Sequence, residues 1–207
     1  MMKKSKRSDV DPFIVMDVME SARIAEEKGK DIIHMEVGQP GTPAPKIAKD
    51  YITNEINKNN LGYTVSLGLP ALRTKISKLY GDWYNLDLNP NRIVVTTGSS
   101  GAFILSFSAL FDSGDRVGIG SPSYPSYRQI LKSLSLETVD IQTKLQNRFQ
   151  PVPEDITNNN LNGILVASPA NPTGSMLDKQ SLENLINTAN ENNVSFISDE
   201  IYHGIQY

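Results

Sequence analysis

The sequence has no cysteine and two histidines, His34 and His203, among its 207 residues. The absence of cysteine excludes disulfides, cysteine-ligated zinc, iron–sulfur clusters and thiol nucleophiles. Single imidazoles on ordinary segments more often pack than react, so we interpret both histidines, and the one tryptophan, Trp83, as structural. A resident metal centre is therefore not expected.

Long apolar runs and an excess of positive charge are also absent. The apolar run Phe13–Met16, which follows the basic N-terminus, is too short for a signal-peptide core or a membrane span. A net charge of −3 supplies no positive field for nucleic acid. We interpret the basic cluster within residues 3–7 as a solvated tail. We therefore expect a cytoplasmic protein that binds neither nucleic acid nor membrane.

The first ninety residues contain the signals of three helices, expected over Phe13–Lys28, Lys46–Asn57 and Pro70–Tyr84. A short strand is expected over Ile32–Val37. The glycines and prolines of residues 38–45 predict a rigid extended loop after it.

From residue 91 onward, short β-branched runs alternate with helical segments. Strands are expected over Arg92–Thr96, Arg116–Gly120, Thr138–Ile141, Gly163–Ala167 and Val194–Ile197. Helices are expected over 100–111, 125–134 and 178–192, and 142–162 is expected to be mostly connection. The alternation predicts an α/β fold with a mostly parallel sheet covered by helices.

Ligands of such sheets bind at the carboxyl ends of the strands, where the first distinctive loop is expected. Residues 96–102 run from a strand directly into a helix, and Gly98, Ser99 and Ser100 place backbone N–H groups and hydroxyls at the helix start. This pattern predicts an anion cradle, although a capping turn would use the same residues. It matches neither the P-loop nor the dinucleotide fingerprint, which favours a phosphate of another kind.

Two further loops supply a flat ring and an amide. In Ser121–Tyr127, prolines flank Tyr124, whose ring is suited to stacking on a ligand or to packing in the core. In Ser168–Gly174, a proline-restricted turn presents the side-chain amide of Asn171 to a possible ligand. A plain β-turn would use the same residues.

The fourth loop places Asp199 just after an apolar strand, with Tyr202 three residues later. A turn of helix would bring the two side chains close together, and an N-cap is the structural alternative for the aspartate. Together the four loops indicate a pocket for one phosphorylated aromatic heterocycle.

The order and spacing of these motifs resemble the class I and II aminotransferases of the fold type I pyridoxal-phosphate enzymes, in particular the aspartate, alanine and aromatic aminotransferases. The similarity runs from near residue 11 to the last residue. It rests on Gly38-x-Pro40, Tyr63 with Gly68 and Leu72-Arg73, Gly98-Ser99-Ser100-Gly101-Ala102, Pro122-x-Tyr124-Pro125, Asn171-Pro172-Thr173-Gly174 and Asp199-Glu200-x-Tyr202.

The resemblance implies the large domain of that fold, an incomplete sheet with helices on both faces. Residues 1–45 would form an N-terminal arm and a segment of the small domain, and residues 46–207 the pyridoxal-phosphate-binding domain. The resemblance also implies a homodimer in the full-length form.

The resemblance assigns most of the cofactor contacts. Asp199 would pair with the pyridine nitrogen and keep it protonated. Asn171 and Tyr202 would bind the phenolic oxygen of pyridoxal 5'-phosphate, and Tyr124 would stack on its ring.

Further contacts concern the phosphate and the substrate. Gly98, Ser99 and Ser100 would hold the phosphate, and Tyr63 would reach the phosphate of a neighbouring subunit. Gly38 would bring a backbone N–H to the substrate carboxylate, an approach that a Cβ would crowd.

One part of the family pattern has no counterpart here. The family's lysine, which forms a Schiff base with the cofactor, follows the Asp-x-x-Tyr motif by a few tens of residues, but no lysine follows Lys179. The substrate-binding arginine of the small domain is missing in the same way. We therefore expect an N-terminal part of an aminotransferase with no catalytic residue of its own, inactive alone and with uncovered apolar surface.

The function predicted for the family is transfer of an amino group between an α-amino acid and a 2-oxo acid. Two alternatives stay open at this point: a carbon–sulfur β-lyase that uses the same motifs, and a non-catalytic truncated fragment that binds the cofactor or a partner. With no cysteine, chemistry would rest on the organic cofactor.

Overall fold

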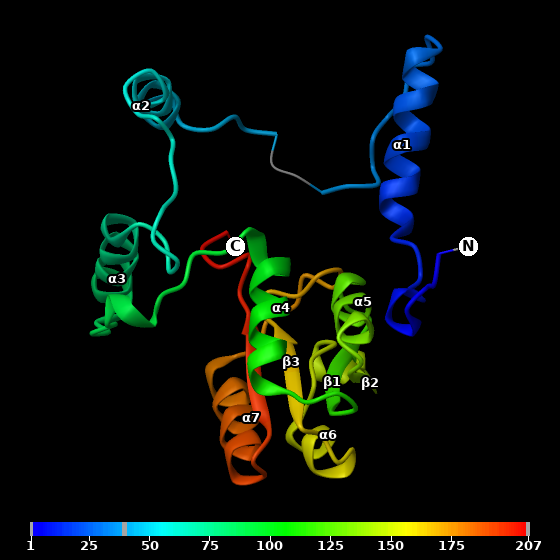
Figure 1. Cartoon of the computed structure of the whole chain (residues 1–207). Helices are drawn as coiled ribbons and strands as arrows, with labels where there is room; N and C mark the ends of the chain where they lie inside the picture. The colour runs from blue at the N-terminus through cyan, green and yellow to red at the C-terminus, as the bar shows by residue number, and fades with distance from the viewer. Residues whose placement is uncertain (1, 39–40, 206–207) are drawn as a thin grey trace. The chain divides into compact units, whose positions relative to one another are not determined.

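The computed structural model describes residues 2–38 and 41–205 of the chain. It divides into two compact units, Met1–Phe13 with Thr97–Tyr207, and Ile14–Thr96. Its α-helices and strands are α1 (Ile14–Glu27), α2 (Lys46–Ile56), α3 (Pro70–Tyr84), α4 (Gly98–Leu110), β1 (Arg116–Ser121), α5 (Ser126–Ser133), β2 (Glu137–Gln142), α6 (Pro153–Asn158), β3 (Gly163–Ala167), α7 (Lys179–Glu191) and β4 (Ser195–Asp199) (Figure 1). Short 3-10 helices lie at Lys6–Ser8, Pro90–Arg92 and Leu145–Asn147.

Within the described part of the first unit, four strands form one parallel sheet in the order β2-β1-β3-β4. The connections between them carry helices, as parallel pairing requires. The predicted α/β class, a parallel sheet with helices on both faces, is confirmed.

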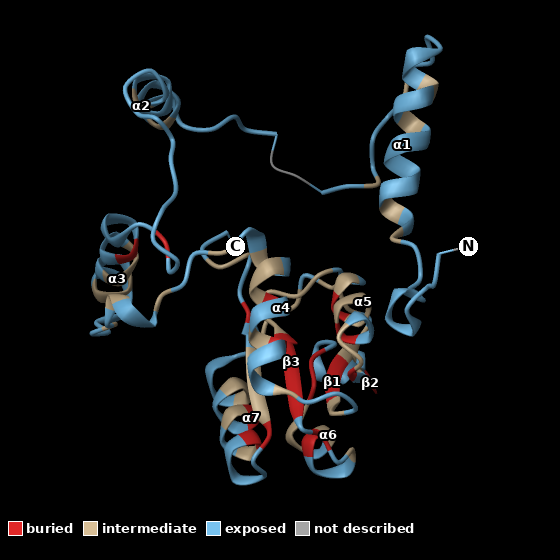
Figure 2. Cartoon of the chain, viewed as in Figure 1, coloured by how far each residue is buried: buried red, intermediate tan, exposed pale blue. Residues whose placement is uncertain are grey.

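The two faces of the sheet bury different sets of side chains, because successive strand residues point to opposite sides. On one face, α4 and α5 pack on β1 and β3 through Phe103, Phe107, Val117, Ile119, Tyr127, Leu131, Leu136 and Leu165. On the other, α6 and α7 pack on β2 and β3 through Ile141, Ile156, Leu161, Ile164, Val166, Leu185, Ala189 and Val194. Figure 2 shows this burial concentrated in the strands and the helix faces turned toward them.

Two strand glycines mark where the helices and connections press closest on the sheet. A Cβ at Gly163 would lie 2.2 Å from Cζ of Phe111, and a Cβ at Gly118 would lie 2.8 Å from Leu161 Cδ1 and 2.9 Å from Ile141 Cδ1. Real Cβ atoms do not approach other atoms this closely, so glycine at these positions permits the packing.

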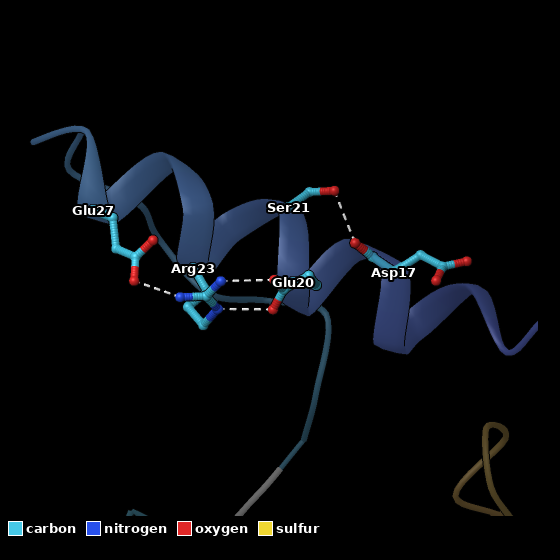
Figure 3. Close-up of polar contacts among 5 residues, drawn as sticks. All are labelled: Asp17, Glu20, Ser21, Arg23 and Glu27. Atoms are coloured by element: carbon cyan, nitrogen blue, oxygen red, sulfur yellow. Dashed lines mark hydrogen bonds and ion pairs between the residues drawn. The ribbon is translucent and has the colours of Figure 1, made fainter.

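In the second unit, α1 carries a network of exposed ion pairs, drawn in Figure 3. Arg23 Nε and Nη2 each donate to Glu20 at 2.7 Å, and Arg23 Nη1 donates to Glu27 Oε1 at 2.5 Å. Beyond the helix, hydrogen bonds from the protonated His34 ring to Glu36 and then to Glu26 raise the pKa of His34 to about 9. These pairs are exposed, so each contributes little to stability.

Residues 67–95 of the second unit are held together by a buried arginine. Arg73, 7% exposed, donates to the Pro90 carbonyl at 3.0 and 3.1 Å and to Asn91 Oδ1 at 2.8 Å. Ser77 Oγ donates to the Leu88 carbonyl at 2.5 Å. Arg73 of the predicted Leu72-Arg73 motif therefore has a structural role that joins α3 to the segment after it.

Three elements differ from the sequence-based expectations. Ile32–Val37 and Arg92–Thr96 form no strand in the described structure, because no neighbouring strand lies beside them to pair with their backbone groups. Conversely, α6 forms within the expected connection, where Pro153 opens the helix and the Asp155 carboxylate accepts from the Val152 N–H at 2.8 Å.

Apolar side chains remain uncovered on α4, where Ile104, Leu105 and Leu110 are 45%, 58% and 50% exposed. This agrees with the expectation of uncovered apolar surface. No helix among the described residues combines the length and the hydrophobicity that crossing a membrane takes.

The close contact at Gly163 gives a test of the packing. We expect Gly163→Ala to lower the free energy of unfolding by about 1–3 kcal/mol, because the new methyl must displace the partly buried Phe111 ring. Urea unfolding measures this, with Gly120→Ala as the control, since its nearest atom, Thr143 Cγ2, lies at an ordinary 3.4 Å. Equal stability of the two variants would show that the packing at Phe111 is looser than described.

Candidate cofactor site

The start of α4 and the carboxyl ends of the strands lie at the same end of the sheet. Helix α4 leads directly into β1 through residues 111–115, so it runs antiparallel to the strands that it covers. Its first turn therefore comes to the end at which β4 finishes, as Figure 1 shows. The topology brings together segments that are about a hundred residues apart in the sequence.

The first turn of α4 has a geometry that would suit an anion. Thr97 is its N-cap but makes no side-chain capping hydrogen bond. Gly98 adopts φ +74°, and a Cβ there would meet no atom within 4 Å, so the space above the turn is open. Ser99 is half-buried and Ser100 exposed. The N-terminal N–H groups of a helix attract negative charge, as predicted for the phosphate.

Asp199 ends β4 with a carboxylate that is 7% exposed. Its Oδ2 accepts a hydrogen bond from the Tyr127 hydroxyl, and its Oδ1 accepts from the Ile201 N–H at 3.1 Å. No ion pair joins Asp199 to any residue that the structure describes. A buried carboxylate is thus held by two neutral donors.

The aromatic residues near Asp199 form a packed group. The Tyr127 ring, 2% exposed, meets Phe103 at a centroid distance of 5.3 Å and Tyr124 at 5.5 Å, both edge to face. Tyr124 also meets Phe13 at 5.8 Å. Burial, followed by the hydrogen bond to Asp199, raises the pKa of Tyr127 well above its usual value, so the phenol stays protonated.

Asn171 and Tyr202 touch each other. Asn171 Nδ2 donates to the Tyr202 hydroxyl at 3.2 Å. The turn that carries Asn171 is closed by hydrogen bonds from Ala170 N to the Ser175 carbonyl at 2.9 Å and from Gly174 N to the Ala170 carbonyl at 2.7 Å. The Asn171 amide and the Tyr202 hydroxyl, both predicted to bind the phenolic oxygen of the cofactor, therefore lie close enough together to reach one oxygen atom.

Two predicted site residues, Gly38 and Tyr63, belong to the second unit, Ile14–Thr96. The Tyr63 side chain is fully exposed on the loop before α3. Gly38 is exposed, and a Cβ there would meet no atom within 4 Å. Pro40, of the predicted Gly-x-Pro motif, lies outside the described residues.

Tyr127 is the contact that sequence reasoning missed. In the segment Ser121–Tyr127, only Tyr124 was predicted to stack on a ligand or pack in the core. A second tyrosine three residues later, on the first turn of a helix, was the available signal. Its partner, Asp199, is 72 residues away, so no local pattern could reveal the bond.

The residues present fit pyridoxal phosphate. The anion-ready first turn of α4 matches the phosphate, and the half-buried Tyr124 offers a ring to the pyridine. The Asn171–Tyr202 pair offers hydrogen bonds to a phenolic oxygen. The buried Asp199 carboxylate, which forms no ion pair with the described residues, matches a protonated ring nitrogen.

Comparison with known proteins decides the family. The sequence model of the class I and II aminotransferases matches residues 30–207. This chain belongs to the class I and II aminotransferases. Members of this family use pyridoxal phosphate, in agreement with the donor set.

Individual aminotransferases resemble the chain over nearly all of its length. A curated valine–pyruvate aminotransferase of Mycobacterium tuberculosis is 41% identical over 203 residues, covering 97% of this chain and 52% of the relative. An aminotransferase structure from Mycobacterium tuberculosis has a TM-score of 0.93 at 40% identity, covering 99% of this chain and 53% of that one. A Silicibacter pomeroyi structure has a TM-score of 0.89 at 59% identity, covering 100% and 53%. The chain thus spans about half the length of these aminotransferases.

The raised pKa of Tyr127 predicts a specific loss of stability in alkali. Below about pH 10 the phenol is protonated in both the folded and the unfolded chain, so its contribution is fully present. Above pH 10 the unfolded phenol ionises while the folded one does not, and stability falls. We expect wild type to lose about 1 kcal/mol more than Tyr127→Phe between pH 10 and pH 11.

Urea unfolding of both proteins at pH 8, 10 and 11 measures this difference. The variant is its own control for all other groups that titrate in alkali, since these are common to both proteins. Parallel losses of stability would show that Tyr127 ionises equally easily in the folded chain.

Proposed function

We propose that this chain supplies the cofactor-holding part of a pyridoxal-phosphate-dependent aminotransferase, which moves an amino group between an α-amino acid and a 2-oxo acid. The observation that carries the proposal is the Asp199 carboxylate, buried at the end of β4 and bonded to neutral donors. Family membership supports the reaction class.

The surroundings of Asp199 favour a cationic partner. A buried charge is costly unless another charge or several hydrogen bonds compensate it. The hydroxyl of Tyr127 and the N–H of Ile201 compensate part of this cost, and each carboxylate oxygen retains a further lone pair. Asp199 would accept from a protonated pyridine nitrogen, which would supply a further donor and a positive charge. When bound, the cofactor provides the electron sink for the carbanion formed at the substrate α-carbon.

Asn171 and Tyr202 are placed to act on the phenolic oxygen of the cofactor. The Tyr202 hydroxyl accepts from Asn171, so it keeps its own hydrogen for donation. Donation to a phenolate would stabilise its negative charge. The Asn171 amide and the Tyr202 phenol would thus tune the basicity of the cofactor's imine nitrogen, which lies beside the phenolic oxygen. Tyr124 would offer its ring for stacking on the pyridine.

The phosphate would lie at the first turn of α4, held by the backbone N–H groups of Gly98, Ser99 and Ser100 and by the hydroxyls of the two serines. A fully exposed Tyr63 supports the proposal that it reaches the phosphate of a second subunit in a homodimer. We propose Gly38 as the backbone donor to the substrate carboxylate.

Two parts of the reaction, the choice of substrates and the residue for the covalent step, are not assigned by the residues described above. The relative from Mycobacterium tuberculosis is named for valine and pyruvate, which are therefore the first pair to test. No lysine follows Lys179, so we assign the covalent step to no residue of this sequence and expect the 207-residue chain to bind without turnover. The cytoplasmic location remains a prediction.

The test uses pyridoxine 5'-phosphate, whose alcohol group, unlike the aldehyde of pyridoxal phosphate, cannot react with surface lysines. We expect Asp199→Asn to bind it about tenfold or more weakly than wild type, because the charged acceptor of the ring nitrogen is lost. Affinity for inorganic phosphate is expected to stay unchanged. Isothermal titration of both ligands measures the effects.

The matched control is Asp178→Asn, an identical change at the exposed N-cap of α7, where asparagine also caps. Equal affinity of wild type and Asp199→Asn for pyridoxine 5'-phosphate would contradict the assignment of the ring nitrogen. Absence of binding by wild type would contradict the proposed cofactor site.

A further inference from the structure

Tyr127 is enclosed by aromatic rings. The ring lies on α5 at 2% exposure, edge to face with Phe103 of α4 and with Tyr124. These neighbours restrict the movement of the ring. Its hydroxyl donates to Oδ2 of Asp199.

The second oxygen of Asp199 is fixed from a different element. Oδ1 accepts from the Ile201 N–H, in the turn that follows β4, at 3.1 Å. One donor therefore comes from α5 and the other from the chain just beyond the strand, each on a different oxygen. Two such bonds hold both the position and the plane of a carboxylate, which a single bond would leave free to rotate.

Both donors are neutral, and this matters for what Asp199 is able to do. A lysine or arginine at the place of Tyr127 would orient the carboxylate but would also neutralise it, and a second cation would then gain little. A phenol orients the carboxylate and leaves its charge available. Burial and the hydrogen bond to Asp199 raise the pKa of Tyr127, so the phenol is protonated at neutral pH and remains a donor.

We propose that Tyr127 is a positioning residue, whose hydroxyl holds the Asp199 carboxylate so that its remaining lone pairs face the ring nitrogen of the cofactor. The inference rests on the proposed function. It assigns Tyr127 no contact with the cofactor or substrate. The hydroxyl acts through Asp199, while the ring contributes to the core.

The ring and the hydroxyl have separate roles, and Tyr127→Phe separates them. The variant keeps the packing against Phe103 and Tyr124 and removes the donor to Asp199. The experiment uses the 207-residue chain and pyridoxine 5'-phosphate labelled with ¹⁵N in the ring. Calorimetry gives the affinity, and the ¹⁵N chemical shift of the bound ring reports how far the nitrogen is protonated, which a merely structural role would not change.

We expect Tyr127→Phe to bind the labelled ligand about tenfold more weakly, and the ¹⁵N shift to move toward that of the unprotonated ring. Affinity for inorganic phosphate should match wild type. Tyr51→Phe is the control, since it makes the same chemical change at an exposed position on α2 and should leave both readouts unchanged.

The outcomes separate the two proposals. If wild type binds the ligand and Tyr127→Phe, still folded, gives the same affinity and the same ¹⁵N shift, the positioning role is wrong and the proposed function stands. If wild type binds pyridoxine 5'-phosphate no more tightly than inorganic phosphate, the proposed function fails, and the positioning role fails with it.

A measurement on the unaltered chain keeps the inference testable if Tyr127→Phe does not fold. The hydroxyl proton of Tyr127 can be identified by NMR in protein with ¹³C-labelled tyrosine, by its loss in Asp199→Asn. We expect this resonance to shift on saturation with pyridoxine 5'-phosphate and to stay in place with inorganic phosphate. A resonance that the ring-containing ligand leaves unmoved would overturn the positioning role.

Discussion

A carboxylate that is 7% exposed must take its compensation from nearby donors, and Asp199 takes it from a buried phenol and a backbone N–H. The rest of the first unit serves this arrangement. Strand β4 carries the aspartate to the end of the sheet, and α5, in the connection between β1 and β2, carries the phenol there. The same core that stabilises the sheet fixes the ring of Tyr127, so packing and site geometry cannot be changed independently.

The parallel order β2-β1-β3-β4 explains why so few residues suffice to build the site. Every strand ends on the same side, so each following loop contributes to one edge: Tyr124 after β1, Asn171 after β3 and Tyr202 after β4. Helix α4, running the opposite way, adds its N-terminus to that edge. Glycine at positions 118 and 163 lets the covering side chains approach the strands closely enough for this compact layering.

A feature could be predicted from the sequence where the residues that determine it lie close together along the chain. Pro70 begins α3 and Asp178 caps α7, so these helix starts could be located from local residues alone. The segments Ile32–Val37 and Arg92–Thr96 have equally good local signals for strands but form none, because a strand also needs a partner that is not encoded beside it. Element type was therefore predictable wherever the determining contacts were local.

The candidate site shows the same division. The carboxylate, amide, phenol and anion-binding turn could be named because each stands at a recognisable place in a loop. Their mutual contacts could not: the bond from Asn171 to Tyr202 spans 31 residues and that from Tyr127 to Asp199 spans 72. The second of these bonds decides which lone pairs of the carboxylate stay available. The motifs alone thus name the proposed ligands of the cofactor but omit Tyr127, the residue proposed to orient Asp199, because that contact arises from tertiary packing.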